Sequence, residues 1–119
     1  MSEQETFDLV VAHARKQGCK SMGEYIGPTS GEPTHGCVYR GENGTACFAG
    51  ALIPNDEYKP EMEGRLAGDC EVAPALQGHN IDFVRKLQNI HDCYEVSEWE
   101  YKLADLAERY GLTYTPPAV

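Results

Sequence analysis

The cysteines and histidines of this chain are the residues that could bind a metal or act as a nucleophile and its base. Five cysteines and four histidines are spread through 119 residues: Cys19, Cys37, Cys47, Cys70, Cys93, His13, His35, His79 and His91. Structural zinc sites are usually built from close pairs such as Cys-x-x-Cys, and the chain contains no such pair. We therefore predict free thiols that pack as small apolar side chains, with no metal or cofactor. A structural zinc built from His35, Cys37, Cys47 and a further ligand is the alternative.

Cys47 is the best candidate for a nucleophile. It follows a turn and precedes small residues, as a thiol at a helix start would, where the helix dipole lowers its pKa. Its base would come from a distant histidine such as His35 or His91, and any cysteine can be paired with any histidine in this way. The sequence therefore predicts no enzyme. A small-ligand binder or Cys/His enzyme centred on Cys47 is kept as an alternative.

Carboxylates and two large side chains alternate in the segment after Pro54. The residues concerned are Asp56, Glu57, Tyr58, Glu61, Met62 and Glu63. One interpretation is a solvated face that only keeps the protein soluble. The other is an acidic docking patch with Tyr58 and Met62 as its anchors, because aromatic and methionine side chains are enriched in interface cores.

The charge balance favours a protein partner over a nucleic acid. Nineteen acidic and ten basic residues give a formal charge of −9, which repels phosphate backbones and anionic membranes. Such a surface suits a partner protein with a basic face. The polar, acidic start of the chain and the lack of a run of about 20 apolar residues predict a cytoplasmic protein with reduced thiols.

Three stretches have helical periodicity, and capping signals mark their ends. Ser2 to Glu5 is a capping box ahead of an apolar stripe, which predicts a helix over residues 3–17 that Gly18 ends. Asn80 caps a second stripe that runs to Tyr94, and Ser97 to Glu100 is a second capping box ahead of a stripe that Gly111 closes. The last two helices are separated by two or three residues, so we expect an antiparallel helical hairpin.

The centre of the chain predicts a small β-unit. Cys37 to Arg40 and Thr45 to Phe48 are interpreted as strands on either side of Asn43-Gly44, which is a strong hairpin-turn signal. A short buried helix then ends before Pro54. The overall prediction is a single α+β domain over residues 1–119, with three to four helices packed on a small antiparallel hairpin. Residues 27–36 are predicted to be a flexible loop and residues 114–119 a frayed tail.

Most of the chain resembles a family of small uncharacterised proteins encoded by tailed bacteriophages. The resemblance is carried by Cys37-Val-Tyr-Arg-Gly, Gly44-x-x-Cys47-x-x-Gly50-x-Leu52-Ile53-Pro54 and Tyr58-x-Pro60-x-Met62-Glu63-Gly64, with Leu87-Gln88-x-x-His91-Asp92 and Trp99 further on. It implies a phage origin and action inside a bacterial cell. It implies no known activity, so it supplies no catalytic residues to carry over. The predicted function is that of an accessory protein that binds and modulates a bacterial host or defence protein without catalysis.

Overall fold

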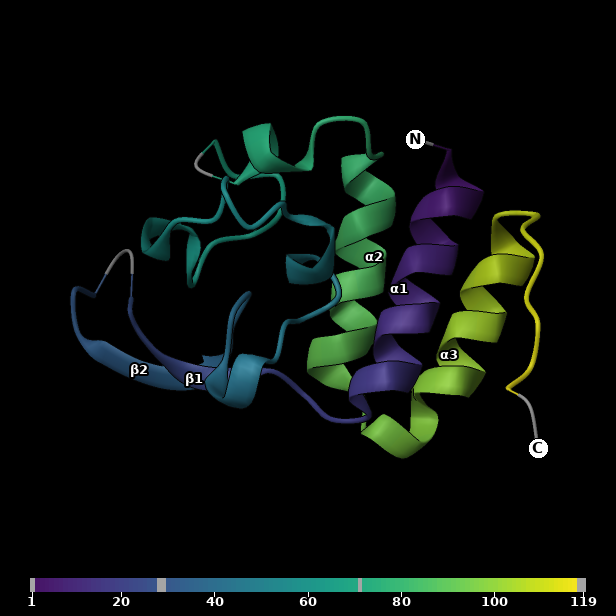
Figure 1. Cartoon of the computed structure of the whole chain (residues 1–119), viewed down its shortest axis with the longest axis horizontal. Helices are drawn as coiled ribbons and strands as arrows, with labels where there is room; N and C mark the ends of the chain where they lie inside the picture. The colour runs from purple at the N-terminus through teal and green to yellow at the C-terminus, as the bar shows by residue number, and fades with distance from the viewer. Residues whose placement is uncertain (1, 28–29, 71, 118–119) are drawn as a thin grey trace.

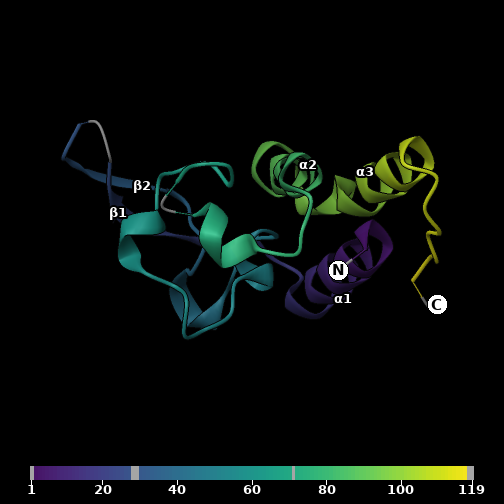
Figure 2. The same ribbon diagram turned by 90° about the horizontal axis from the view of Figure 1, so that it is seen from above.

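The computed structural model describes residues 2–27, 30–70 and 72–117, and it confirms the α+β prediction. Three α-helices and a two-stranded antiparallel hairpin form one compact globule (Figure 1). The elements are α1 (Glu3–Gln17), β1 (Met22–Ile26), β2 (Pro33–Cys37), α2 (Ile81–Cys93) and α3 (Val96–Arg109). The helices gather at one end of the molecule, and the hairpin lies at the other (Figures 1 and 2). Short 3₁₀ turns, among them Gly50–Leu52 and Pro60–Met62, connect the two ends.

The first helix has the predicted bounds and caps. The Ser2 hydroxyl accepts a hydrogen bond from the Glu5 amide at 3.1 Å, and the Glu5 carboxylate accepts one from the Ser2 amide at 3.1 Å. Gly18 ends the helix in a left-handed conformation (φ 67°), which glycine adopts at little cost. Phe7 and Val10 turn inward from this helix and are almost fully buried.

Helices α2 and α3 form the predicted antiparallel hairpin (Figure 1). Asn80 caps α2 by accepting a hydrogen bond from the Phe83 amide at 3.3 Å. The predicted cap of α3 is wrong by two residues, because Glu95 forms the capping box with Glu98 and Ser97 already lies inside the helix. None of the helices in the described part of the chain has the length and apolar character needed to cross a bilayer.

The position of the β-hairpin differs from the prediction. The turn at Asn43-Gly44 is present, with positive φ at both residues (60° and 74°), but only one bridge, Arg40 to Ala46, flanks it. The backbone amides of Tyr39 and Arg40 are directed instead to the side chain of Glu63. A strand ladder cannot extend where a side chain already takes its donors.

The paired strands are Met22–Ile26 and Pro33–Cys37, so the last four residues of the loop predicted over residues 27–36 belong to a strand. Residues 28 and 29 lie outside the described residues. Pro33 is the first residue of β2, a position where its missing amide hydrogen costs no ladder bond. The sequence signal was weak because β2 reads Pro-Thr-His-Gly-Cys, which has no alternation of apolar and polar residues.

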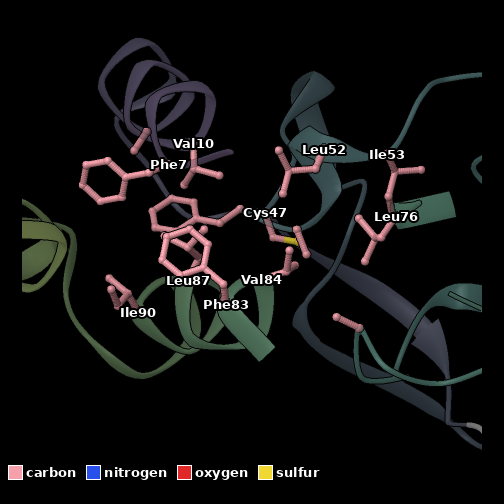
Figure 3. Packing of buried hydrophobic residues seen from close by; sticks show 14 of the residues in the cluster. Phe7, Val10, Cys47, Leu52, Ile53, Leu76, Phe83, Val84, Leu87 and Ile90 are labelled. Atoms are coloured by element: carbon pink, nitrogen blue, oxygen red, sulfur yellow. The ribbon is translucent and has the colours of Figure 1, made fainter. Parts of the chain in front are cut away.

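One hydrophobic core joins the helices to the central segment. Figure 3 shows Phe7 and Val10 of α1 facing Phe83 and Leu87 of α2, with Cys47 beside them. Leu52, Ile53 and Leu76 continue the core toward the hairpin end. Cys47, Phe48 and Ala49 are each at most 1% exposed. The short buried helix predicted before Pro54 is a 3₁₀ turn, Gly50–Leu52, in which Gly50 and Leu52 are buried and Ala51 is exposed.

The C-terminal segment is attached through its first two residues, in contrast to the predicted frayed tail. The Tyr114 hydroxyl donates to Glu100 at 2.7 Å, and the Arg15 guanidinium donates to the Thr115 carbonyl at 2.7 Å. Arg15 also forms a two-bond ion pair with Glu100 at 2.8 and 3.0 Å. Residues 118 and 119 of the predicted tail lie outside the described residues.

Candidate functional site

The acidic segment, residues 55–61, is held to the body of the protein by the buried carboxylate of Glu63. One carboxylate oxygen accepts a hydrogen bond from the Tyr39 amide at 2.7 Å. The other accepts from the Arg40 amide at 3.1 Å and from the Tyr58 hydroxyl at 2.7 Å. Glu63 is 7% exposed, so these three bonds replace the water that the carboxylate has lost.

Tyr58 and Arg40 complete this anchor. The Arg40 guanidinium lies 5.5 Å from the centre of the Tyr58 ring and donates to the Ile53 carbonyl at 2.6 Å. Burial, followed by the hydrogen bond to Glu63, raises the pKa of the Tyr58 hydroxyl, which therefore stays protonated and donates. The segment from Pro54 to Gly64 is thus fixed at both ends by side-chain contacts.

The predicted docking residues divide into two groups. Asp56, Glu57 and Glu61 are exposed, and Tyr58 is half-buried. Met62 is only 4% exposed and belongs to the hydrophobic core, so it offers no anchor to a partner. Glu63 is occupied by its internal bonds. The surface that this segment offers therefore consists of three carboxylates and the accessible part of Tyr58.

Cys47 is placed where a nucleophile could not work. It is 1% exposed, and its sulfur accepts a hydrogen bond from the Gly50 amide at 3.2 Å. Burial raises the pKa of this thiol strongly, so the thiolate is not available near neutral pH. His35, one of its candidate bases, is exposed on β2.

The structure brings Cys37, His91 and Asp92 together. Among the described residues, these form the only group of three potential metal ligands, with their ligand atoms within 4.8 Å of one another. The zinc set considered from the sequence, with His35, Cys37 and Cys47, is not assembled. Sequence reasoning missed Asp92 as the neighbour of Cys37, because the two residues come from β2 and the end of α2.

The hydrogen bonds of His91 define its role. The Ser21 amide donates to Nε2 at 3.0 Å, so Nε2 carries no hydrogen. The hydrogen is then on Nδ1, which donates to the Asp92 carboxylate at 2.7 Å. The ring is fully buried, stacks on Trp99 and meets Phe48 edge-on. Both ring nitrogens are therefore satisfied within the protein, and neither has a lone pair free for a metal.

The Cys37 thiol is also not activated as a nucleophile. Burial, followed by the nearby Asp92 carboxylate, raises its pKa to about 11. Partial burial opposes ionisation of Asp92, but hydrogen bonds from His91, Gln88 and Cys37 outweigh it and lower the pKa of that carboxyl. In this cluster the Cys37 thiol and the His91 imidazole are both hydrogen-bonded to the Asp92 carboxylate, whereas an activated thiol is hydrogen-bonded to the imidazole itself. The arrangement is that of a hydrogen-bond network joining β2 to α2.

A surface groove runs over α2. It has a volume of about 900 Å³ and is lined along α2 from Asp82 to Asp92. Lys102, Leu106 and Arg109 of α3 line one side, and Arg65 and Leu66 line the other. Figure 2 shows α2 between the hairpin end and α3.

Comparisons of this chain with protein-family models, with curated proteins and with solved structures gave no match.

Proposed function

We propose that this protein is a non-catalytic binding protein that docks its acidic segment on a basic surface of a partner protein. The segment comprises residues 55–61, with Asp56, Glu57 and Glu61 exposed and Tyr58 half-buried among them. The resemblance to phage proteins makes the partner a bacterial host or defence protein, or a phage protein, in the cytoplasm of the infected cell. Modulation of that partner's activity is the expected consequence of docking.

The observation that carries the proposal is the anchoring of this segment by Glu63. Its three hydrogen bonds, from Tyr39, Arg40 and Tyr58, attach the acidic segment at Tyr58 to the body of the protein before any partner arrives. Ordering a loop on binding costs free energy, so a segment already ordered loses less affinity. Exposed carboxylates on an ordered segment also steer a basic partner and suppress acidic ones.

The state of the thiols supports the non-catalytic part of the proposal. Cys47 is buried, and the pKa values of the Cys37 and Cys47 thiols are both raised. A nucleophilic cysteine needs a lowered pKa and access to its substrate.

The proposal is tested by capture from bacterial lysate followed by a binding measurement with the purified partner. The full chain is immobilised, and proteins bound at low and moderate salt are identified by mass spectrometry. The double variant Asp56→Lys with Glu57→Lys is compared with a control of equal charge change, Glu32→Lys with Glu108→Lys, whose residues are also exposed.

We expect the acidic-segment variant to lose the partner and the control to retain it. The dissociation constant should rise about tenfold or more for the acidic-segment variant, since it removes two attractive charges and adds two repulsive ones. Failure to capture any protein reproducibly, or equal weakening by the two double variants, would contradict the proposal.

A further inference from the structure

Basic side chains are concentrated around α2 in an otherwise acidic protein. All ten Lys and Arg residues are described, and five of them line the α2 groove: Arg65, Arg85, Lys86, Lys102 and Arg109. Of the nineteen acidic residues all but Glu71 are described, and four of those eighteen line the groove. The rest of the described chain therefore carries fourteen acidic and five basic residues. The lining of the groove is therefore less acidic than the rest of the described chain, so a negative group is repelled less there.

Most of the carboxylates of the groove are already engaged within the protein. Glu63 accepts the three hydrogen bonds of the anchor. Asp92 accepts from His91 and from Gln88, each at 2.7 Å. Asp105 pairs with Arg109 at 3.1 Å, one turn away on α3. The fourth, Asp82, lies in the first turn of α2, where the helix dipole favours a negative charge.

Two lysines of the groove are positioned by tyrosines and not by carboxylates. The Lys86 ammonium donates to the Tyr110 hydroxyl at 2.9 Å and lies 5.1 Å from the centre of that ring. The Lys102 ammonium lies 4.3 Å from the centre of the Tyr94 ring. An aromatic face orients an ammonium without neutralising its charge. Both lysines therefore keep N–H donors for a ligand.

Arg85 adds a third available cation. It is exposed, lines the groove and forms no ion pair with any described residue. Leu66, on the facing side, is 66% exposed and adds an accessible apolar side chain to the lining. The groove thus combines cations with one uncovered apolar side chain.

We propose that the α2 groove binds an acidic peptide segment of a partner protein. Carboxylates of the peptide meet Arg85, Lys86 and Lys102, and an apolar side chain of the peptide covers Leu66. The negative charge of the surrounding surface disfavours a long polyanion such as a nucleic acid, because phosphates beyond the groove would be repelled. This site is separate from the acidic segment and binds groups of the opposite charge.

The test is an NMR titration of the ¹⁵N-labelled full chain with two synthetic peptides. One peptide consists of repeated Glu-Glu-Leu units and the other of repeated Lys-Lys-Leu units. We expect the Glu-Glu-Leu peptide to shift amide resonances of residues 82–94 and 102–110, with affinity that falls as salt is raised. The Lys-Lys-Leu peptide should leave these resonances unchanged.

Charge-reversal variants then distinguish binding in the groove from a general effect of the net charge of the protein. Arg85→Glu with Lys86→Glu should raise the dissociation constant of the Glu-Glu-Leu peptide about tenfold. The control Lys16→Glu with Lys59→Glu changes the net charge equally at exposed sites outside the groove and should have little effect. Circular dichroism checks that both variants are folded, and Lys102→Gln gives a milder second test of the groove.

Three results would overturn the proposal. The first is no shift in the groove with the Glu-Glu-Leu peptide, and the second is equal weakening by the groove and control variants. The third is a dimer in sedimentation analysis that Arg85→Glu with Lys86→Glu disrupts, since the occupant would then be a second copy of this chain. None of these results bears on the acidic segment, which is tested by Asp56→Lys with Glu57→Lys.

Discussion

At the scale of single residues, Glu63 is the side chain on which the central segment depends. Its carboxylate accepts hydrogen bonds from the backbone amides of Tyr39 and Arg40 and from the Tyr58 hydroxyl. This explains the pattern Tyr58-x-Pro60-x-Met62-Glu63-Gly64 in physical terms. Met62 packs into the core, Glu63 accepts three bonds, and Gly64 provides the positive φ (78°) that follows.

Glu63→Gln should therefore destabilise the protein. The amide nitrogen of glutamine would face one of the donors that now bind the carboxylate, and a buried donor would be left unsatisfied. We expect a loss of about 2 kcal/mol in the free energy of unfolding, measured with urea. Glu61→Gln, at an exposed neighbouring position, should change it by less than about 0.5 kcal/mol. Similar losses in the two variants would contradict the role given to Glu63.

Thiol reactivity offers a second test at this scale. Cys19, Cys70 and Cys93 are exposed, Cys37 is half-buried with a pKa raised to about 11, and Cys47 is buried. Because the thiolate is the reactive form, the three exposed cysteines should be labelled first by a maleimide or disulfide reagent near neutral pH. Cys37 should follow slowly, and Cys47 should react only on unfolding. Rapid labelling of Cys47 in the folded protein would restore the Cys/His enzyme as a candidate.

At the scale of elements, the turn after Cys47 decides how closely the central segment packs. Residues 50–52 form a 3₁₀ turn, and Gly50 at its start lies directly against the backbone of Tyr39. A β-carbon at this position would overlap the Tyr39 carbonyl oxygen. Only glycine allows this approach, because backbone atoms cannot move aside as the end of a side chain can.

Gly50→Ala should thus be among the most damaging small substitutions in the chain. We expect a destabilisation of about 3 kcal/mol, from the forced separation of two backbone segments. The control is Gly36→Ala in β2, where the new carbon would make an ordinary contact of 3.9 Å with the Tyr25 side chain. That variant should lie within about 1 kcal/mol of the parent. Thermal unfolding of both variants checks the difference, and equal stabilities would refute the packing argument.

At the scale of the whole molecule, α1 and the segment after α3 meet on the helical face. Arg15 of α1, Glu100 of α3 and the segment after α3 share one set of hydrogen bonds. Gln4 adds two bonds to the backbone of Thr113, at 2.8 and 3.0 Å. These contacts tie α1 to α3 across about a hundred residues of sequence, at the end of the molecule away from the hairpin (Figure 2).

Shortening the chain measures how much these contacts contribute to the free energy of unfolding. A chain that ends at Thr113 lacks the hydrogen bonds of Tyr114 and Thr115. It also lacks the contact of the Tyr114 side chain with the hydrophobic core. We expect its free energy of unfolding to fall by about 1 kcal/mol, because the bonds are partly exposed. A chain that ends at Thr115 keeps both contacts and should match the parent. If the two shortened chains were equally stable, the segment would contribute nothing to the fold.

Much of the fold was readable from local signals. The three helices follow from apolar stripes with caps at Ser2 and Asn80, since those interactions are formed within a few residues. The turn at Asn43-Gly44 was also correct. The position of the hairpin was not, because β1 and β2 lack an alternating pattern and because Glu63 takes the amides that would have extended the predicted strands.

The acidic and basic surfaces show the division between sequence and tertiary structure most clearly. The sequence by itself determined the charge of −9, the three helices and the acidic composition of the segment after Pro54, because these depend on composition and short-range spacing. Only the tertiary structure decided that Met62 and Glu63 are buried, that Cys37 lies beside Asp92, and that half of the basic residues gather over α2. These features join residues far apart in the chain. Such contacts are formed by packing, and local propensity contains no information about them.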